Sequence, residues 1–171
     1  MLSFINSPLQ IGSLTIPHRL IQGPLAGFSC APFRELFNHF TPPAYAVSEM
    51  SSALDILHKH SANSRYVYRS PKEKILAYQI SGTQENVMAD AAATLQDFGA
   101  DLIDINCGCP KIKIRKKGAG SALLENPDLL ISIIRRVREV LHIPLTIKIR
   151  LQNNANDIQL AQQISDSGAD A

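Results

Sequence analysis

The strongest chemical pattern in the sequence is a carboxamide and a thiol at the end of an apolar run. Residues 102–106 alternate as Leu-Ile-Asp-Ile-Asn and lead into a Cys-Gly-Cys-Pro turn. Glycine and proline directly after such a run indicate that a strand ends there. In parallel α/β proteins, chemistry gathers just beyond the carboxyl ends of strands. Asn106 and Cys109 are therefore candidate substrate-binding and reactive residues.

A basic segment follows this turn. Five of the next seven residues are cationic: Lys111, Lys113, Arg115, Lys116 and Lys117. Such a run is more often a solvated loop than a binding patch, but beside a reactive strand end it also suits an anionic substrate. Phosphate groups, including those of an RNA backbone, are the ligands that we expect for it. Lys111, Lys113 and Arg115 are the candidate contacts.

Two further strand segments carry polar side chains where apolar ones are expected. Lys148 and Arg150 share one side of a predicted strand, and charges there are costly unless they meet an anion or an electron-rich ligand. Gln79 ends another apolar strand and needs a hydrogen-bond partner, which either a cofactor edge or a neighbouring backbone would supply.

Each of these residues also has a structural interpretation. A free cysteine such as Cys109 is commonly a small buried hydrophobic residue, and Asn106 would also cap the turn. Cys107 and Cys109 form a Cys-x-Cys pair, but zinc needs about four ligands and no others are apparent, so we predict no metal site. The role of Glu49 stays open. We interpret the remaining cysteine and two histidines as structural or surface groups: Cys30, His58 and His60.

The composition is typical of one globular domain. The chain has 171 residues, 45% of them hydrophobic, and a formal net charge of +2, too small to indicate nucleic-acid binding by itself. No apolar run reaches the roughly 20 residues of a membrane helix, so we expect no membrane partner, and no signal peptide is apparent. Three cysteines make no disulfide framework, and a reducing cytoplasm is the expected location.

Hydrophobic periodicity predicts alternating strands and helices. The expected strands are a hairpin at 9–16 and segments 20–22, 44–47, 75–80, 102–106 and 144–150. The expected helices are 29–40, 87–98, one that begins at 126–128 and runs to 141, and 157–167. Residues 51–74 are helix-prone, but their pattern sets no bounds. This alternation favours a parallel α/β sheet, open or closed.

A short motif recurs near the end of the sequence. Gly99-Ala100-Asp101 precedes one predicted strand, and Gly168-Ala169-Asp170 stands in the same position after a later helix. The second copy predicts that a sixth strand begins there. Because an eight-stranded barrel usually takes about 250 residues, we expect the chain to be about the first five βα units of a truncated (β/α)₈ barrel.

Taken together, these segments resemble the tRNA-dihydrouridine synthases. The resemblance rests on an ordered set of motifs: residues 24–27 (Pro-Leu-Ala-Gly), 32–34 (Pro-Phe-Arg), 48–50 (Ser-Glu-Met), Gln79, 106–110 (Asn-Cys-Gly-Cys-Pro), 118–124 (Gly-Ala-Gly-Ser-Ala-Leu-Leu) and 148–150 (Lys-Ile-Arg). The resemblance implies an FMN-containing TIM barrel followed by a helical tRNA-binding domain. It also implies reduction of the C5–C6 double bond of uridines in tRNA with NADPH.

The resemblance also implies roles for individual residues. Pro24, Leu25 and Ala26 would lie against the flavin, with Leu25 where the family usually has Met. Gln79 would hydrogen-bond the flavin ring, and Lys148 would face its N1–O2 edge.

The family's proton donor corresponds to Cys109. Asn106 and Arg150 would help to hold a uracil base taken out of the tRNA, and Cys107 has no implied role.

Other family features have no counterpart among the 171 residues. These are a His-x-Arg motif, the loops that bind the FMN phosphate and the helical domain, so residues 1–171 would be an incomplete barrel domain. On that basis we expect weak FMN binding, doubtful activity and self-association through an open sheet edge. The alternatives are another FMN barrel oxidoreductase that acts on a small molecule, and a non-catalytic, self-associating fragment.

Overall fold

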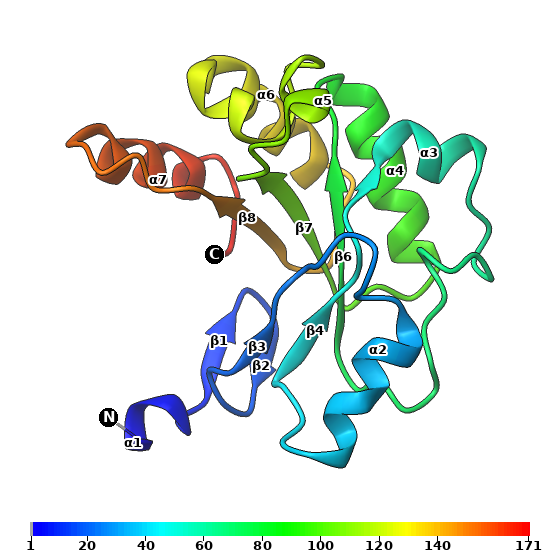
Figure 1. The fold of residues 1–171 in the computed structure, drawn as a ribbon. Coiled ribbons are helices and arrows are strands. Elements are labelled where there is room, and N and C mark those ends of the chain that lie inside the picture. The colour runs from blue at the N-terminus through cyan, green and yellow to red at the C-terminus, as the bar shows by residue number, and fades with distance from the viewer. Residues whose placement is uncertain (1) are drawn as a thin grey trace.

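Strands and helices alternate along the chain, and most strands lie side by side in one curled sheet (Figure 1). The computed structural model describes residues 2–171. The sheet contains β3 (Ile21–Gln22), β4 (Tyr45–Val47), β5 (Ser51–Ser52), β6 (Leu76–Ser81), β7 (Leu102–Cys107) and β8 (Leu145–Ile149). Its order is β3-β4-β6-β7-β8, with β5 beside β6, and every neighbouring pair is parallel. This half-barrel confirms the predicted α/β class of TIM-barrel type.

Helices pack on the outer face of the sheet. The four predicted helices are present as α2 (Ala31–Leu36), α4 (Glu85–Asp97), α6 (Pro127–Arg138) and α7 (Asn156–Asp166). The first of them is shorter than predicted and continues as the 3₁₀ helix η1 (Phe37–His39). Residues 51–74, for which the sequence set no bounds, contain α3 (Ala53–His58), and a short helix α1 (Leu2–Ile5) precedes the hairpin.

The basic segment is partly helical rather than a simple loop. It forms α5 (Ile112–Arg115), and the 3₁₀ helix η2 (Gly120–Glu125) follows. The Lys111 carbonyl accepts from the backbone N–H groups of Ile114 at 2.9 Å and Arg115 at 3.0 Å. No glycine or proline interrupts residues 111–117, and Lys and Arg have good helix propensity. The segment therefore forms helical turns, which end at Gly118, a glycine with a φ of 76°.

Helix α6 shows how the local sequence sets an element. The Asn126 side chain accepts from the backbone N–H of Leu129 at 3.3 Å, and Pro127 occupies the first turn, where its missing N–H costs nothing. Its last turn holds basic residues near the negative end of the helix dipole. The apolar stripe that packs on the sheet is Leu130, Ile133, Ile134 and Val137.

The two faces of the sheet differ in chemistry. The outer face joins the helices in the main core, which includes Tyr78, Ile80, Ile103, Ile105 and Cys107. At the amino end of the strands the inner face is also apolar, because the hairpin of β1 (Leu9–Ile11) and β2 (Leu14–Ile16) packs there against Val47, Ala77 and Leu102. Further along the same strands the inner face becomes polar. Function is therefore expected at the carboxyl end.

The second Gly-Ala-Asp motif begins another strand, as predicted. The N–H of Asp170 donates to the Leu145 carbonyl at 2.8 Å, and the N–H of Ile147 donates to the Ala171 carbonyl at 2.9 Å. These alternating bonds are those of a parallel neighbour. Residues 170–171 therefore extend the sheet beyond β8.

Candidate active site at the carboxyl ends of the strands

A cavity of about 190 Å³ lies where the strands end. It is lined by Pro24, Ala26, Met50, Gln79, Asn106, Gly108, Cys109, Pro110, Lys148 and Arg150. These residues come from segments at or beyond the ends of β3, β4, β6, β7 and β8. The fold thus gathers most of the residues selected from the sequence, although they span more than a hundred positions of the chain.

A larger cavity, of about 380 Å³, lies at the amino ends of β4 and β6. Its lining includes Pro17, Pro42, Pro43 and Ile75, together with several charged side chains. None of the predicted site residues reaches it. Because chemistry in parallel sheets gathers at carboxyl ends, the smaller cavity is the better candidate despite its size.

A row of polar side chains crosses the inner face beneath this cavity. Nε2 of Gln79 donates to Oδ2 of Asp104 at 2.6 Å, and Oε1 of Gln79 accepts from Nδ2 of Asn106 at 2.9 Å. Oδ1 of Asn106 accepts from the backbone N–H groups of Gly108 at 3.2 Å and Cys109 at 2.9 Å. The structural interpretation of Asn106 as a turn cap is thereby confirmed. Its contact with a substrate stays a prediction.

Asp104 is the site residue that sequence reasoning missed. It is buried, and Thr146 donates from Oγ1 to its Oδ1 at 2.6 Å. Burial raises the pKa of Asp104 to about 6, although the hydrogen bonds from Gln79 and Thr146 and the nearby charge of Lys148 act in the opposite direction. The alternation of residues 102–106 could have revealed it, because Asp104 shares the inner face with Asn106.

The two cysteines of the Cys-x-Cys pair lie in different surroundings. Cys107 ends β7 on the helix side and is fully buried in the main core, where burial raises the pKa of its thiol. Cys109 lies beyond the strand, is half-buried and lines the cavity. Of the two thiols, only that of Cys109 is placed to meet a ligand in this cavity.

The backbone at Cys109 is held on both sides. Its N–H is bound by Asn106, and its carbonyl accepts from the Ser121 N–H at 3.0 Å. Gly120 makes this close approach possible, because a Cβ there would lie 2.7 Å from the Cys109 carbonyl oxygen. Its φ of 64° also favours glycine. The thiol is therefore carried on an ordered turn.

The turn after β3 forms the opposite wall of the cavity. The buried carboxylate of Glu49 accepts from the Gly27 N–H at 2.5 Å and from Nη2 of Arg65 at 2.8 Å. Pro24 and Ala26 line the cavity, whereas the Leu25 side chain is half exposed and lies outside its lining. The structure thus gives Glu49, whose role the sequence left open, a position that holds this wall.

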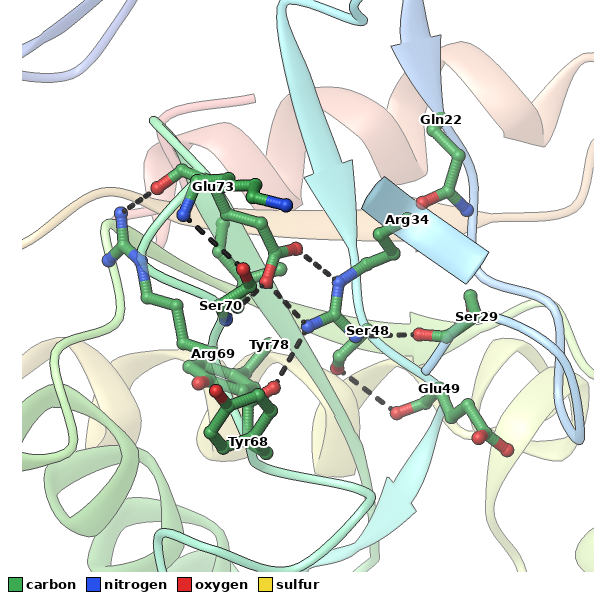
Figure 2. A network of polar contacts seen from close by, with 12 residues as sticks. Gln22, Ser29, Arg34, Ser48, Glu49, Tyr68, Arg69, Ser70, Glu73 and Tyr78 are labelled. Atoms are coloured by element: carbon green, nitrogen blue, oxygen red, sulfur yellow. Dashed lines mark hydrogen bonds and ion pairs between the residues drawn. The ribbon is translucent and has the colours of Figure 1, made fainter. Parts of the chain in front are cut away.

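A buried ion pair ties the same turn to the segment that precedes β6 (Figure 2). Arg34 is 2% exposed and donates to both carboxylate oxygens of Glu73, at 2.5 and 3.0 Å. It also donates to the carbonyls of Ser29 at 2.7 Å and Tyr68 at 3.0 Å. With its donors satisfied in this way, Arg34 is a structural clamp behind the site.

The remaining predicted cations are placed around the rim. Arg150 lines the cavity and donates to the Gly108 carbonyl at 3.1 Å. Arg115 is engaged within its own segment, with Ser121 at 2.9 Å and Glu125 at 2.6 Å. Lys111 and Lys113 are exposed and line no part of the cavity. A role in binding RNA phosphates outside the cavity stays a prediction.

Residues 2–171 contain no cluster of three or more His, Cys, Asp or Glu side chains that could hold a metal ion. None of the helices in this part of the chain has the length and apolar character needed to cross a membrane.

Comparisons with known proteins agree on one family. The family model of dihydrouridine synthases (Dus) matches residues 21–171. The probable tRNA-dihydrouridine synthase 1 of Synechocystis sp. is 38% identical over 165 residues, which are 95% of this chain and 46% of that protein. The tRNA-dihydrouridine synthase B of Vibrio vulnificus is 38% identical over 166 residues, 95% of this chain and 51% of the relative.

The corresponding enzyme of Pasteurella multocida is 34% identical over 166 residues, 95% of this chain and 50% of the relative. The chain thus spans about half the length of these curated relatives. The family match covers almost all of the half-barrel and every residue that lines the candidate site. The chain belongs to the dihydrouridine synthase family.

Proposed function

We propose that this chain forms the flavin- and uridine-facing side of a site that reduces uridine in tRNA to 5,6-dihydrouridine, with FMN as cofactor and NADPH as reductant. The observation that carries the proposal is the convergence of Cys109, Asn106, Gln79 and Lys148 on one cavity. The relatives named as tRNA-dihydrouridine synthases support the same reaction. Such an enzyme would act in the cytoplasm with its tRNA, and these residues would be the first part of its (β/α)₈ barrel.

The residues present suit a flavin ring. Gln79 and Asn106 each use one amide N–H within the row, which leaves each a second N–H, and Lys148 adds a cation on the next strand. Together they offer donors to the N1–O2 edge of an isoalloxazine, which carries acceptors. Pro24, Ala26 and Met50 supply a mostly apolar wall against which the ring plane would pack.

Charge explains the place of Lys148. FMN, if bound here and reduced by NADPH, would supply a hydride for C6 of the uracil ring. Lys148 would stabilise the negative charge that a reduced flavin carries at its N1–O2 edge. Lys148 is exposed in this structure, so its ammonium group has little desolvation cost in the absence of a ligand.

Cys109 has the position of a general acid. As C6 gains the hydride, the electron pair of the C5–C6 bond forms a new C5–H bond with the thiol proton, and the S–H bond breaks. Solvent returns a proton to the thiolate. Asn106 and Arg150 line the same cavity and would hold the uracil, which must first leave the base stack of the tRNA. Lys111, Lys113 and Arg115 would contact phosphates outside.

The test is dihydrouridine formation by an enzyme that carries these residues within a complete barrel, supplied with FMN, NADPH and unmodified tRNA, and measured by mass spectrometry of the nucleosides. In that full-length context the unsubstituted enzyme should add two hydrogens to a defined uridine, and Cys109→Ala should lose most of this activity while it still binds FMN. Flavin reduction by NADPH without transfer to tRNA would favour the other enzyme class, an FMN barrel that reduces a small molecule.

A second candidate is self-association of a non-catalytic chain. It is favoured by apolar side chains near the two ends of the sheet, because Leu20 before β3, Ile21 within β3 and Leu151 after β8 are all exposed. Exposed sheet edges are templates for pairing between chains. Light scattering across a concentration series tests this candidate, since a constant monomer mass would exclude it.

A further inference from the structure

We propose that Asp104 is a positioning residue, which acts through Gln79 and Asn106 to fix the direction of both side-chain amides and the backbone N–H of Cys109. Its importance for uridine reduction rests on the proposed function. The arrangement itself is a property of this chain and can be tested without cofactor or tRNA.

The argument begins at the buried end of the row. Each Asp104 oxygen accepts one hydrogen bond, from Gln79 at 2.6 Å and from Thr146 at 2.6 Å. An ionised carboxylate has no hydrogen to donate. Gln79 must therefore turn its NH₂ group toward Asp104 and its carbonyl oxygen toward the next strand. The carboxylate selects one of the two directions that a glutamine amide could take.

The direction of the Gln79 amide in turn determines the direction of the Asn106 amide, which binds the turn that carries Cys109. The oxygen of Gln79 can be satisfied only by a donor, so Asn106 presents Nδ2 to it at 2.9 Å. The oxygen of Asn106 then faces the N–H groups of Gly108 and Cys109. A backbone N–H can only donate, so both ends of the row require the same direction. Reversal of either amide would place donor against donor or acceptor against acceptor.

The direction also decides what a ligand meets. With Asp104 accepting, the free N–H groups of Gln79 and Asn106 belong to residues that line the cavity. A ligand with carbonyl oxygens or ring nitrogens is then matched. With the amides reversed, carbonyl oxygens would meet those acceptors and repel them. Asp104 would thus set the polarity of the site without touching the ligand.

Stability alone does not account for the carboxylate. Asp104 is 7% exposed on the inner face, where its oxygens accept from Gln79 and Thr146, and the nearby Lys148 forms no ion pair with it. The ion pairs formed within residues 2–171 do not include it. A buried charge is costly, and such groups are found where a site requires them.

The experiment measures amide hydrogen exchange at Gly108 and Cys109 by NMR in the 171-residue chain, with three substitutions. Asp104→Leu removes the acceptor for Gln79. In Asp104→Asn, the new side-chain NH₂ can donate to the Thr146 hydroxyl. The side-chain oxygen then still accepts from Gln79. Thr146→Val is the matched control, since it removes the other hydrogen bond of Asp104 and leaves the row intact.

We expect Asp104→Leu to speed exchange of the Cys109 amide about tenfold, the worth of one hydrogen bond, and to shift the Asn106 side-chain NH₂ resonances. Asp104→Asn and Thr146→Val should leave both close to wild type. Equal exchange in Asp104→Leu and wild type would overturn the proposal. An equal increase in the exchange rate of the Cys109 amide in Asp104→Leu and Thr146→Val would also overturn the proposal. Such a result would show only that both substitutions destabilise the region in general.

Asp104→Leu could also fail to fold, so a second break in the row is included. Gln79→Met interrupts the row and leaves the carboxylate in place. The same faster exchange at Cys109 is expected, with the exchange of α6 amides unchanged. Undisturbed exchange at Cys109 in Gln79→Met would sink the proposal. Because neither flavin nor tRNA enters these measurements, a failed activity assay cannot be confused with a failure of this inference.

Discussion

Asp101 and Asp170 occupy equivalent places in alternate βα units, because each follows the helix of its unit and one full unit lies between them. Oδ2 of Asp101 accepts from the N–H of Leu76 at 2.7 Å, and Oδ2 of Asp170 accepts from the N–H of Leu145 at 2.9 Å. Each aspartate thereby binds the first residue of the neighbouring strand. Each also pairs with an arginine, at 2.8 Å to Arg69 and at 3.1 Å to Arg138. The repeated Gly-Ala-Asp motif is a device for docking one strand beside the previous one.

Loss of either docking aspartate should destabilise the sheet. We expect Asp101→Ala and Asp170→Ala each to lower the free energy of unfolding by about 1.5–3 kcal/mol, because each removes a hydrogen bond to a charged group. Urea denaturation provides the measurement. Asp90→Ala, on the exposed side of α4, should be nearly neutral. A loss confined to one of the two motifs would show that they are not equivalent.

The two neighbouring cysteines should respond differently to substitution. Cys109→Ala should lower the rate of uridine reduction roughly 10²–10⁴-fold, because a positioned acid is lost. Cys107→Ala should leave that rate nearly unchanged and affect only packing, since its side chain lies in the core. Turnover on unmodified tRNA decides the matter. Near-normal activity of Cys109→Ala would remove the thiol from the mechanism.

The titration of Asp104 should be visible in the stability of the protein. Burial raises its pKa from 3.8 to about 6, so the folded state holds the proton more tightly than the unfolded state. The group therefore favours folding at low pH, and this contribution is lost as the pH rises through about 6. The other titratable groups that interact electrostatically with it are Lys148 on the neighbouring strand β8, Tyr45 on β4 and Cys107 on β7 itself.

Comparison with Asp104→Asn isolates this effect. The unfolding free energy of wild type relative to the variant should fall by up to about 3 kcal/mol between about pH 4 and pH 7, following the shift in pKa. Urea denaturation across this range measures it. A difference that is flat, or that rises with pH, would contradict the raised pKa of Asp104.

Two lysines should separate flavin binding from tRNA binding. Lys148→Met should weaken FMN binding about tenfold or more, since a charge-assisted contact at the ring edge is lost, whereas Lys148→Arg should keep part of it. Quenching of flavin fluorescence measures the affinity. Lys113→Met, outside the cavity, should leave FMN binding unchanged and reduce tRNA affinity in a salt-dependent way. The opposite pattern would reverse the two assignments.

The clamp behind the site should be sensitive to the loss of one partner. Arg34→Met leaves Glu73 buried without its cation and should cost about 3–5 kcal/mol of stability. The double substitution Arg34→Met with Glu73→Leu should recover much of this loss, because it removes both charges. Chemical denaturation of wild type, the single variants Arg34→Met and Glu73→Leu, and the double variant tests the coupling. Additive losses would show that the pair does not act as a unit.

Local patterns were enough to predict the hairpin, the five longer-range strands β3, β4, β6, β7 and β8, the four helices α2, α4, α6 and α7, and the gathering of Asn106 and Cys109 at one end. Alternation and the Gly and Pro that follow determine where a strand stops, and parallel strands stop at the same side. The importance of Asp104 depends on register between strands, which no local pattern specifies. The pairing of Arg34 with Glu73 joins residues 39 positions apart, and periodicity does not encode such a contact.

The side chain of Leu25 shows a different limit. Its neighbours Pro24 and Ala26 line the cavity, but the Leu25 side chain is half exposed and lies outside the lining. A residue-by-residue transfer from a family motif treats consecutive positions alike. The turn does not, so contact between Leu25 and a flavin stays a prediction.

The hairpin of β1 and β2 has a kinetic consequence. By packing across the amino end of the strands, it leaves their carboxyl end as the open approach. On the proposed function, a nicotinamide donor and a uridine would both approach from this end, one after the other. Double-reciprocal plots for NADPH and tRNA should then be parallel, with each substrate in excess inhibiting the half-reaction of the other.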